Sequence, residues 1–298
     1  TGLERMVSEV VTQTSYERGE AEVEARGSAP VPKSSAHRWV AQRRIPSSKA
    51  TESVSGMADG TGFKKWPAQR GDLRVVIGLG PEGEIKPLGT YAGRTWEDIG
   101  GDVRQKLKDD NAQLEIFAVD GEIGLDRHLA TEARHAQRCL WHLPRDLKYA
   151  MWEDKAPLDE RIAMAGKVAG LVGIEVPEGD LEAVSTKDKA SLKNAIKKNE
   201  DDLKSLAGDF RSRGYPKAAT YLENAIGNVF SHVRLWLETG IVAPRTTSIL
   251  ENIMREIGRR AKKLGYNWSD QGVVRMTKMV LLRRYDEDEW NSYWKEQL

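Results

Sequence analysis

The stretch VVIGLGPEG, residues 75–83, decides between two very different folds for this chain. Its three glycines match the spacing G-x-G-x-x-G, which in dinucleotide-binding proteins joins a strand to a helix whose N-terminus holds pyrophosphate. A strand is indicated before the turn, because valine and isoleucine favour β-structure. The next segment, EIKPLGTYAG at 84–93, contains a proline and two further glycines and does not predict a helix. We therefore interpret 75–83 as a strand running into a Pro-Glu-Gly hairpin turn, and we expect no nucleotide cofactor.

The composition is that of a globular protein with room for a sizeable core. The 298 residues are 39% hydrophobic and 31% charged, and no apolar run approaches the ~20 residues that a membrane span needs. We expect two or three structural units, no membrane partner and a cytoplasmic location. The single cysteine, Cys139, excludes an intrachain disulfide and suits a reducing compartment. The first residue, Thr1, is followed by no signal-peptide pattern, which indicates a fragment or a processed chain.

Positive charge is concentrated in short segments, although the formal net charge is only +1. These segments are HRWVAQRR at 37–44, GRRAKK at 258–263 and LLRR at 281–284. Such clusters are typical of surfaces that contact phosphate, and the alternative for each is an ordinary solvated helix face.

Residues 1–50 are predicted to form a small helical region that binds DNA. Helical patterning extends over 4–27, and the SAPVP break follows it. A short basic helix is then expected within 33–44, with Ser34 or Ser35 as its N-cap. A helix, a Gly/Pro turn and a second short basic helix have the outline of a helix-turn-helix.

Residues 51–144 alternate between strands and helices, which predicts a mixed α/β (α+β) sheet covered by helices. The expected strands are at 53–58, 73–80, 85–93, 114–121 and 138–143, and the expected helices are at 95–110 and 125–137. Residues 145–245 are predicted to be an all-helical insertion. The helices of 246–298 are expected to return and complete the sheet domain.

Two aspartates, Asp59 and Asp120, end apolar strands and run directly into glycine. If the first strand neighbours the fourth, these two carboxylates converge at one edge of the sheet. Like charges at short range repel unless a cation lies between them, and Mg²⁺ prefers carboxylate oxygens. Each Asp-Gly taken alone is a common turn, and the pair is what indicates chemistry.

Glu251 is the candidate for a third carboxylate ligand. It lies at the border of an apolar helical stripe that includes Leu250, Ile253 and Ile257. The competing interpretation is a capping box, in which Ser248 is the N-cap and Glu251 is the N3 residue.

At this point the residues resemble a known family, the Mutator-type DDE transposases of insertion sequences. The resemblance covers about 50–285 and rests on DGTG at 59–62, VDG at 119–121, CLWH at 139–142 and PRTTSILENIMREIGRR at 244–260. It implies an RNase H-like core that is interrupted by a helical insertion before the final glutamate. It also implies that Asp59, Asp120 and Glu251 hold two Mg²⁺ or Mn²⁺ ions, with Cys139 and His142 supporting the site.

The resemblance further implies cleavage and strand transfer of double-stranded DNA at the element ends and the target, in a prokaryotic, nucleoid-associated protein. A homodimer or higher assembly on DNA is expected, because two element ends must be processed together. The alternative is a non-catalytic DNA-binding protein derived from a decayed or domesticated transposase. The residues expected to contact DNA are Arg38, Arg43, Arg44, Arg255, Arg259, Arg260 and Trp236.

Two assignments stay open at the level of sequence. His128, His135, Cys139 and His142 lie within fifteen residues, so they are either zinc ligands or core and supporting residues. A zinc site would use His135 and Cys139 on one helix face. Trp236 is either a core residue or an aromatic that stacks on a DNA base, as in similar transposases.

Overall fold

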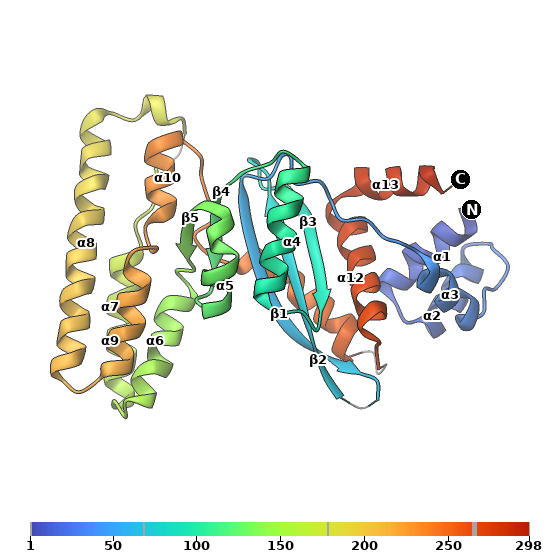
Figure 1. Ribbon diagram of the computed structural model, residues 1–298, viewed down its shortest axis with the longest axis horizontal. Helices are drawn as coiled ribbons and strands as arrows, with labels where there is room; N and C mark the ends of the chain where they lie inside the picture. The colour runs from blue at the N-terminus through green and yellow to red at the C-terminus, as the bar shows by residue number, and fades with distance from the viewer. Residues whose placement is uncertain (1, 68, 178, 264–266, 298) are drawn as a thin grey trace. The chain divides into compact units, whose positions relative to one another are not determined.

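In the computed structural model, residues 2–67, 69–177, 179–263 and 267–297 are described (Figure 1). The chain forms two compact units. The first unit contains residues 1–53, 58–112 and 249–298, and the second contains residues 54–57 and 113–248.

The first unit begins with three helices that pack on one another, α1 (Gly2–Gln13), α2 (Tyr16–Ala25) and α3 (Lys33–Gln42). The prediction of continuous helix over 4–27 was wrong at Ser15, whose Oγ accepts the Arg18 N–H at 3.1 Å and caps α2. The predicted serine cap of α3 was also wrong. That helix follows Pro32, which has no side-chain capping bond.

Five strands form one mixed sheet in the order β3-β2-β1-β4-β5. Strand β1 runs parallel to β4, β4 runs parallel to β5, and β2 is antiparallel to β3. The mixed α/β class is therefore confirmed. The first and fourth strands are neighbours, which was the condition for Asp59 and Asp120 to lie at one edge of the sheet. The strands are β1 (Ser55–Lys65), β2 (Gln69–Leu79), β3 (Ile85–Ala92), β4 (Leu114–Val119) and β5 (Ala133–Arg138).

The hairpin predicted at 75–83 is confirmed. The Gly80 N–H donates to the Glu84 carbonyl at 2.8 Å, and Gly83 adopts φ +89°, a conformation that glycine accepts without strain. Strand β3 follows directly, so no helix N-terminus is present for a pyrophosphate.

The fifth strand occupies different residues from those expected. The predicted helix at 125–137 is replaced by α5 (Ile123–His128), a 3₁₀ turn η1 (Ala130–Glu132) and then β5. Residues 133–138 pair with β4 from Leu114↔Ala133 to Val119↔Arg138. This tertiary pairing overrides a local pattern that favours helix.

Helix α12 (Asp270–Tyr285) packs on β3 and β2, so one C-terminal helix does lie against the sheet. Figure 1 shows α12 running beside β3 within the first unit. The other helical elements of this unit are α4 (Trp96–Asp109), α11 (Ser248–Gly258), the π-helical stretch η3 (Arg259–Lys263) and α13 (Glu287–Glu296).

The second unit is mainly helical after β5 and has its own core. Its buried residues include Leu147, Leu203, Phe210, Leu222 and Phe230. The elements are α6 (His142–Glu153), α7 (Leu158–Val172), the 3₁₀ turn η2 (Leu181–Ala183), α8 (Thr186–Ser212), α9 (Pro216–Ile226) and α10 (Ser231–Thr239). Among the described residues, none of the helices is both long and apolar enough to cross a membrane.

Candidate functional site

Asp120 lies where sequence reasoning expected it, directly after β4. Its Oδ1 accepts the Glu122 N–H at 2.9 Å, which orients the carboxylate at the strand end. The residue is half-buried. Gly121 follows with φ +100°, so the chain turns sharply away from the sheet immediately after the carboxylate.

Asp59 differs from the prediction, because it lies inside a strand rather than at a strand end. Strand β1 continues through Asp59 to Lys65, since the hairpin with β2 extends well beyond the stretch that pairs with β4. The recorded β1–β4 register ends at Met57↔Ala118. Asp59 lies two residues after Met57, and Asp120 lies two residues after Ala118. The two aspartates therefore occupy equivalent positions beyond the last recorded pair of these parallel strands.

Glu251 lies in the first turn of α11 and is half-buried. The predicted apolar stripe beside it is confirmed, because Leu250, Ile253 and Ile257 are all buried. Helix α11 begins at Ser248, whose Oγ lies 2.9 Å from Thr246 Oγ1. Glu251 therefore presents a carboxylate at the edge of a packed helix face.

Across the described ranges, no group of three or more His, Cys, Asp or Glu side chains is arranged to hold a metal ion. The structure thus assembles neither the predicted Asp59, Asp120 and Glu251 triad nor the zinc cluster within these ranges. His135 belongs to β5, and its Nε2 lies 3.4 Å from Glu238 Oε2. His135 and Cys139 therefore do not share a helix face, which the zinc interpretation required, because His135 lies in a strand.

Behind Asp120 lies a buried polar cluster, which we call the strand-end network (Cys139, His142 and Thr247). Cys139 follows β5, and its N–H donates to the Val119 carbonyl of β4 at 2.7 Å. Its Sγ lies 3.2 Å from His142 Nδ1 and 3.4 Å from both the N and the Oγ1 of Thr247. Thr247 Oγ1 is also 3.3 Å from His142 Nδ1, so each member contacts the other two.

The strand-end network shifts the titration of its members. Burial raises the pKa of the Cys139 thiol, but the hydrogen bonds with His142 and Thr247 outweigh burial and lower the pKa from 9.0 to about 7. Burial lowers the pKa of His142, but the bond with Cys139 and the charges of Cys139 and Asp120 outweigh it and raise the pKa. The contacts of the cluster therefore lower the pKa of the Cys139 thiol and raise the pKa of the His142 imidazole.

A second polar group at the same strand ends was not found from the sequence. Arg138 is buried, and its Nη2 donates to the Tyr221 hydroxyl at 2.6 Å. Burial raises the pKa of Asp126, while the positive charge of Arg138 opposes the shift and Asp120 adds to it. A Cβ on Gly121 would lie 1.1 Å from Arg138 Nη1, so the glycine leaves room for the guanidinium.

Gln137 and His232 form a buried link between β5 and α10 that the sequence also did not reveal. Gln137 Oε1 accepts the His232 N–H at 2.8 Å and lies 3.1 Å from His232 Nδ1. His232 Nε2 lies 3.2 Å from the Ile174 carbonyl. A buried glutamine at the end of a short polar strand gives no distinct pattern in one sequence.

The arginines predicted to contact DNA fall into two sets. Arg38, Arg44, Arg255 and Arg259 are exposed. Arg260, in contrast to the expectation, is buried and donates to the Val11 carbonyl of α1 at 2.6 Å. Arg43 also bonds internally, to Glu4 at 2.5 Å and to Gln297 at 3.0 Å, and its guanidinium lies 5.0 Å from the Trp294 ring.

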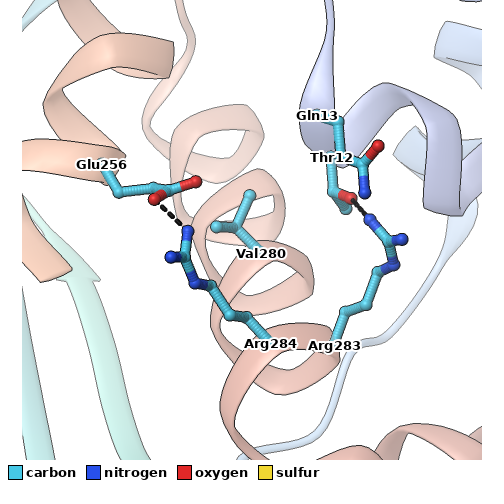
Figure 2. A pocket seen from close by; sticks show the side chains of 6 residues that line it. All are labelled: Thr12, Gln13, Glu256, Val280, Arg283 and Arg284. Carbon is cyan, nitrogen blue, oxygen red and sulfur yellow. Dashed lines mark hydrogen bonds and ion pairs between the residues drawn. The ribbon is translucent and has the colours of Figure 1, made fainter.

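The LLRR segment also bonds within the first unit rather than projecting freely (Figure 2). Arg283 donates to Thr12 Oγ1 at 2.7 Å and to the Glu9 carbonyl at 2.9 Å, and Arg284 pairs with Glu256. These side chains border a pocket of about 280 Å³. For this cluster the structure favours a role in packing over phosphate contact.

Trp236 lies in the core of the second unit, with none of its side chain exposed. A DNA base has no access to the indole in this structure, so the core interpretation is the one that burial favours.

No protein-family model matches this sequence, and a search of curated proteins finds no significant match.

Proposed function

We propose that this chain is a metal-dependent DNA transposase of the DDE type, with an RNase H-like core that the helical residues 145–245 interrupt. The observation that carries the proposal is the placement of Asp59 and Asp120. Both follow, by the same number of residues, the last recorded pair of two adjacent parallel strands. Support also comes from the order of the sheet and from the packing of α12 on β3.

The donor chemistry of the three proposed ligands suits Mg²⁺ or Mn²⁺, because all are carboxylates. Asp59, Asp120 and Glu251 would hold the ions. When bound, the ions would supply charge neutralisation and an activated oxygen nucleophile for phosphodiester cleavage and strand transfer. Since the described residues form no ready group of three ligands, we expect Glu251 to complete the site when metal and DNA are present.

The strand-end network would position the second carboxylate. The contact with Cys139 and the charge of Asp120 raise the pKa of His142, which favours the positively charged form of its ring near that carboxylate. An adjacent cation favours the ionised form of a carboxylate, which is the form that binds metal. The Asp120–Glu122 bond fixes the direction of the same group.

DNA would be held by exposed cations outside the carboxylate site. Arg38 and Arg44 lie on or next to α3, the second helix of the proposed helix-turn-helix, and Arg255 and Arg259 follow Glu251. Contacts of this kind provide salt-dependent affinity that is independent of sequence. A homodimer or larger assembly on two DNA ends, in a prokaryotic cytoplasm, completes the proposal.

A plasmid-nicking assay tests the proposal. The full chain is incubated with supercoiled plasmid and Mn²⁺, beside Asp59→Asn, Asp120→Asn and Glu251→Gln. We expect each variant to lose at least 100-fold in nicking rate, because each removes a charged metal ligand. Glu122→Gln is the matched control, since this exposed carboxylate lies two residues from Asp120 and should leave the rate unchanged.

Two outcomes would count against the enzyme. Nicking that persists equally in Asp120→Asn would exclude the triad. Plasmid binding by all proteins without nicking by any of them would favour the non-catalytic DNA-binding alternative.

A further inference from the structure

Helix α6 has two apolar faces, and only one of them is used for packing. Leu143, Leu147 and Met151 are fully buried in the core of the second unit. The opposite face carries Trp141, Tyr149 and Trp152, whose exposed fractions are 53%, 63% and 56%. The outer face of a surface helix is normally polar, so three large exposed aromatic side chains on one helix call for an explanation.

These aromatic residues share their face with cations. With about 100° between successive residues, Trp141, Arg145, Lys148, Tyr149 and Trp152 all fall within an arc of about 100°. Trp141 has helical backbone angles and so belongs to this arc. We call these five residues the aromatic stripe. It extends for about 16 Å along the helix.

Two of the rings are already in contact with a cation. The Arg145 guanidinium lies 4.9 Å from the Trp141 ring, and Lys155 Nζ lies 5.9 Å from the Trp152 ring. Arg145 also pairs with Asp146 at 2.7 Å. The nearest carboxylates of α6, those of Asp146 and Glu153, project from outside the arc, and Glu153 pairs with Lys217 of α9 at 2.8 Å.

We propose that the aromatic stripe binds an unpaired nucleic-acid strand, with bases stacked on the rings and phosphates held by Arg145, Lys148 and Lys155. Aromatic rings interleaved with cations form the surface that sequence-independent single-strand binding uses. Charge favours this occupant over an apolar protein segment, because the arc contains Arg145 and Lys148 and no carboxylate, and Asp146, which pairs with Arg145, projects from outside it. The inference rests on the proposed function in one respect, which is that opened DNA ends supply the strand.

The test measures binding of a fluorescein-labelled oligo(dT) to the full chain by anisotropy, in EDTA so that no cleavage occurs. Trp141→Ala, Tyr149→Ala and Trp152→Ala should each weaken binding about fivefold or more, and the phenylalanine substitutions should restore most of it. Trp66→Ala is the matched control, because Trp66 is 70% exposed on the first unit and should bind normally.

The cations are tested separately through salt dependence. In Lys148→Gln/Lys155→Gln, the slope of log K against log salt should fall by about 1.4, which corresponds to two phosphate contacts on a single strand. Unchanged oligo(dT) affinity in the triple alanine variant would overturn the proposal. The proposal would also be overturned if the wild type were a dimer and the triple alanine variant a monomer, because the stripe would then be a self-association surface.

Failure of this inference and failure of the proposed function are distinguishable. Asp120→Asn should bind oligo(dT) as well as wild type does, while losing Mn²⁺-dependent nicking. If the stripe variants lose oligo(dT) binding, the aromatic stripe is supported. If Asp120→Asn still nicks plasmid in the same experiment, the triad is rejected.

Discussion

The strand-end network and the aromatic stripe meet at Trp141, yet they differ in every physical respect. The network joins Cys139 and His142 to Thr247, distant in sequence, and all three are buried and bonded to one another. The stripe uses neighbours on one helix, and its rings are exposed. Buried polar contacts hold a site in place, whereas rings that stay largely exposed are available for recognition, even though Trp141 also touches the His142 ring.

The largest expected effect on stability comes from removing a buried aromatic side chain. Trp236→Ala should lower the free energy of unfolding by about 3–5 kcal/mol, because it leaves a large cavity in the second unit. Urea denaturation followed by circular dichroism measures the change. A loss below about 1 kcal/mol would show that Trp236 is not packed as described.

Gly121→Ala should destabilise the strand ends by about 2–3 kcal/mol. The new Cβ would have to displace Arg138, and φ +100° strains any residue with a side chain. Gly166→Ala in α7 is the matched control. No atom lies within 4 Å of the added methyl group there, and an alanine in a helix should stabilise the protein by up to about 1 kcal/mol.

The thiol of Cys139 should make stability depend on pH. Its folded pKa of about 7 lies below the unfolded value of 9.0, so the unfolded state binds more protons between these limits. The contribution of the thiol is therefore present above pH 9 and is lost as the pH falls through 7. The stability difference between wild type and Cys139→Ala should grow by on the order of 1–2 kcal/mol from pH 7 to 9.

The contribution of His142 to stability should change with pH in the opposite direction. Its folded pKa is raised, so its contribution is present below the usual histidine pKa and is lost as the pH rises through the folded value. Thiolate absorbance at 240 nm follows Cys139 directly, and in His142→Asn its midpoint should move upwards. An unchanged midpoint would contradict the hydrogen-bonded pair.

The smallest effect belongs to the aromatic stripe. Trp152→Ala should change the free energy of unfolding by less than about 0.5 kcal/mol, because the side chain is exposed and its removal leaves no cavity. Thermal unfolding of this variant beside Trp236→Ala separates the two classes of tryptophan. A large loss in Trp152→Ala would assign the stripe to packing rather than recognition.

The features predicted correctly are those with a local cause. The hairpin at 75–83 follows from glycine and proline, and the apolar stripe of α11 follows from helical periodicity. Errors arose where a distant partner decides the outcome. Strand β5 lies at 133–138 because β4 pairs with it, and β1 continues past Asp59 because β2 pairs with it.

The same division applies to the candidate site. Residue type and position at strand ends made Asp59 and Asp120 candidates, and the family resemblance added Cys139 and His142. The sequence did not identify Thr247 as a partner of Cys139, nor Arg138 and Asp126 as neighbours of Asp120. Thr247 lies 108 residues from Cys139, so spacing carries no trace of that contact. Arg138 and Asp126 are closer to Asp120 in the chain, but the turn after β4 sets their positions, and no short sequence pattern marks that arrangement.

The sequence alone indicates the mixed α/β class and the hairpin in place of a nucleotide-binding turn, and it offers Asp59, Asp120 and Glu251 as candidate metal ligands. These depend on backbone preference and residue type, which act over a few neighbouring positions. The tertiary structure sets which arginines stay exposed, and it buries Trp236 but not Trp152. It also brings Cys139 Sγ to 3.2 Å from His142 Nδ1. Burial and hydrogen bonding are properties of segments that folding brings together, so residue type alone does not separate the buried Trp236 from the exposed Trp152.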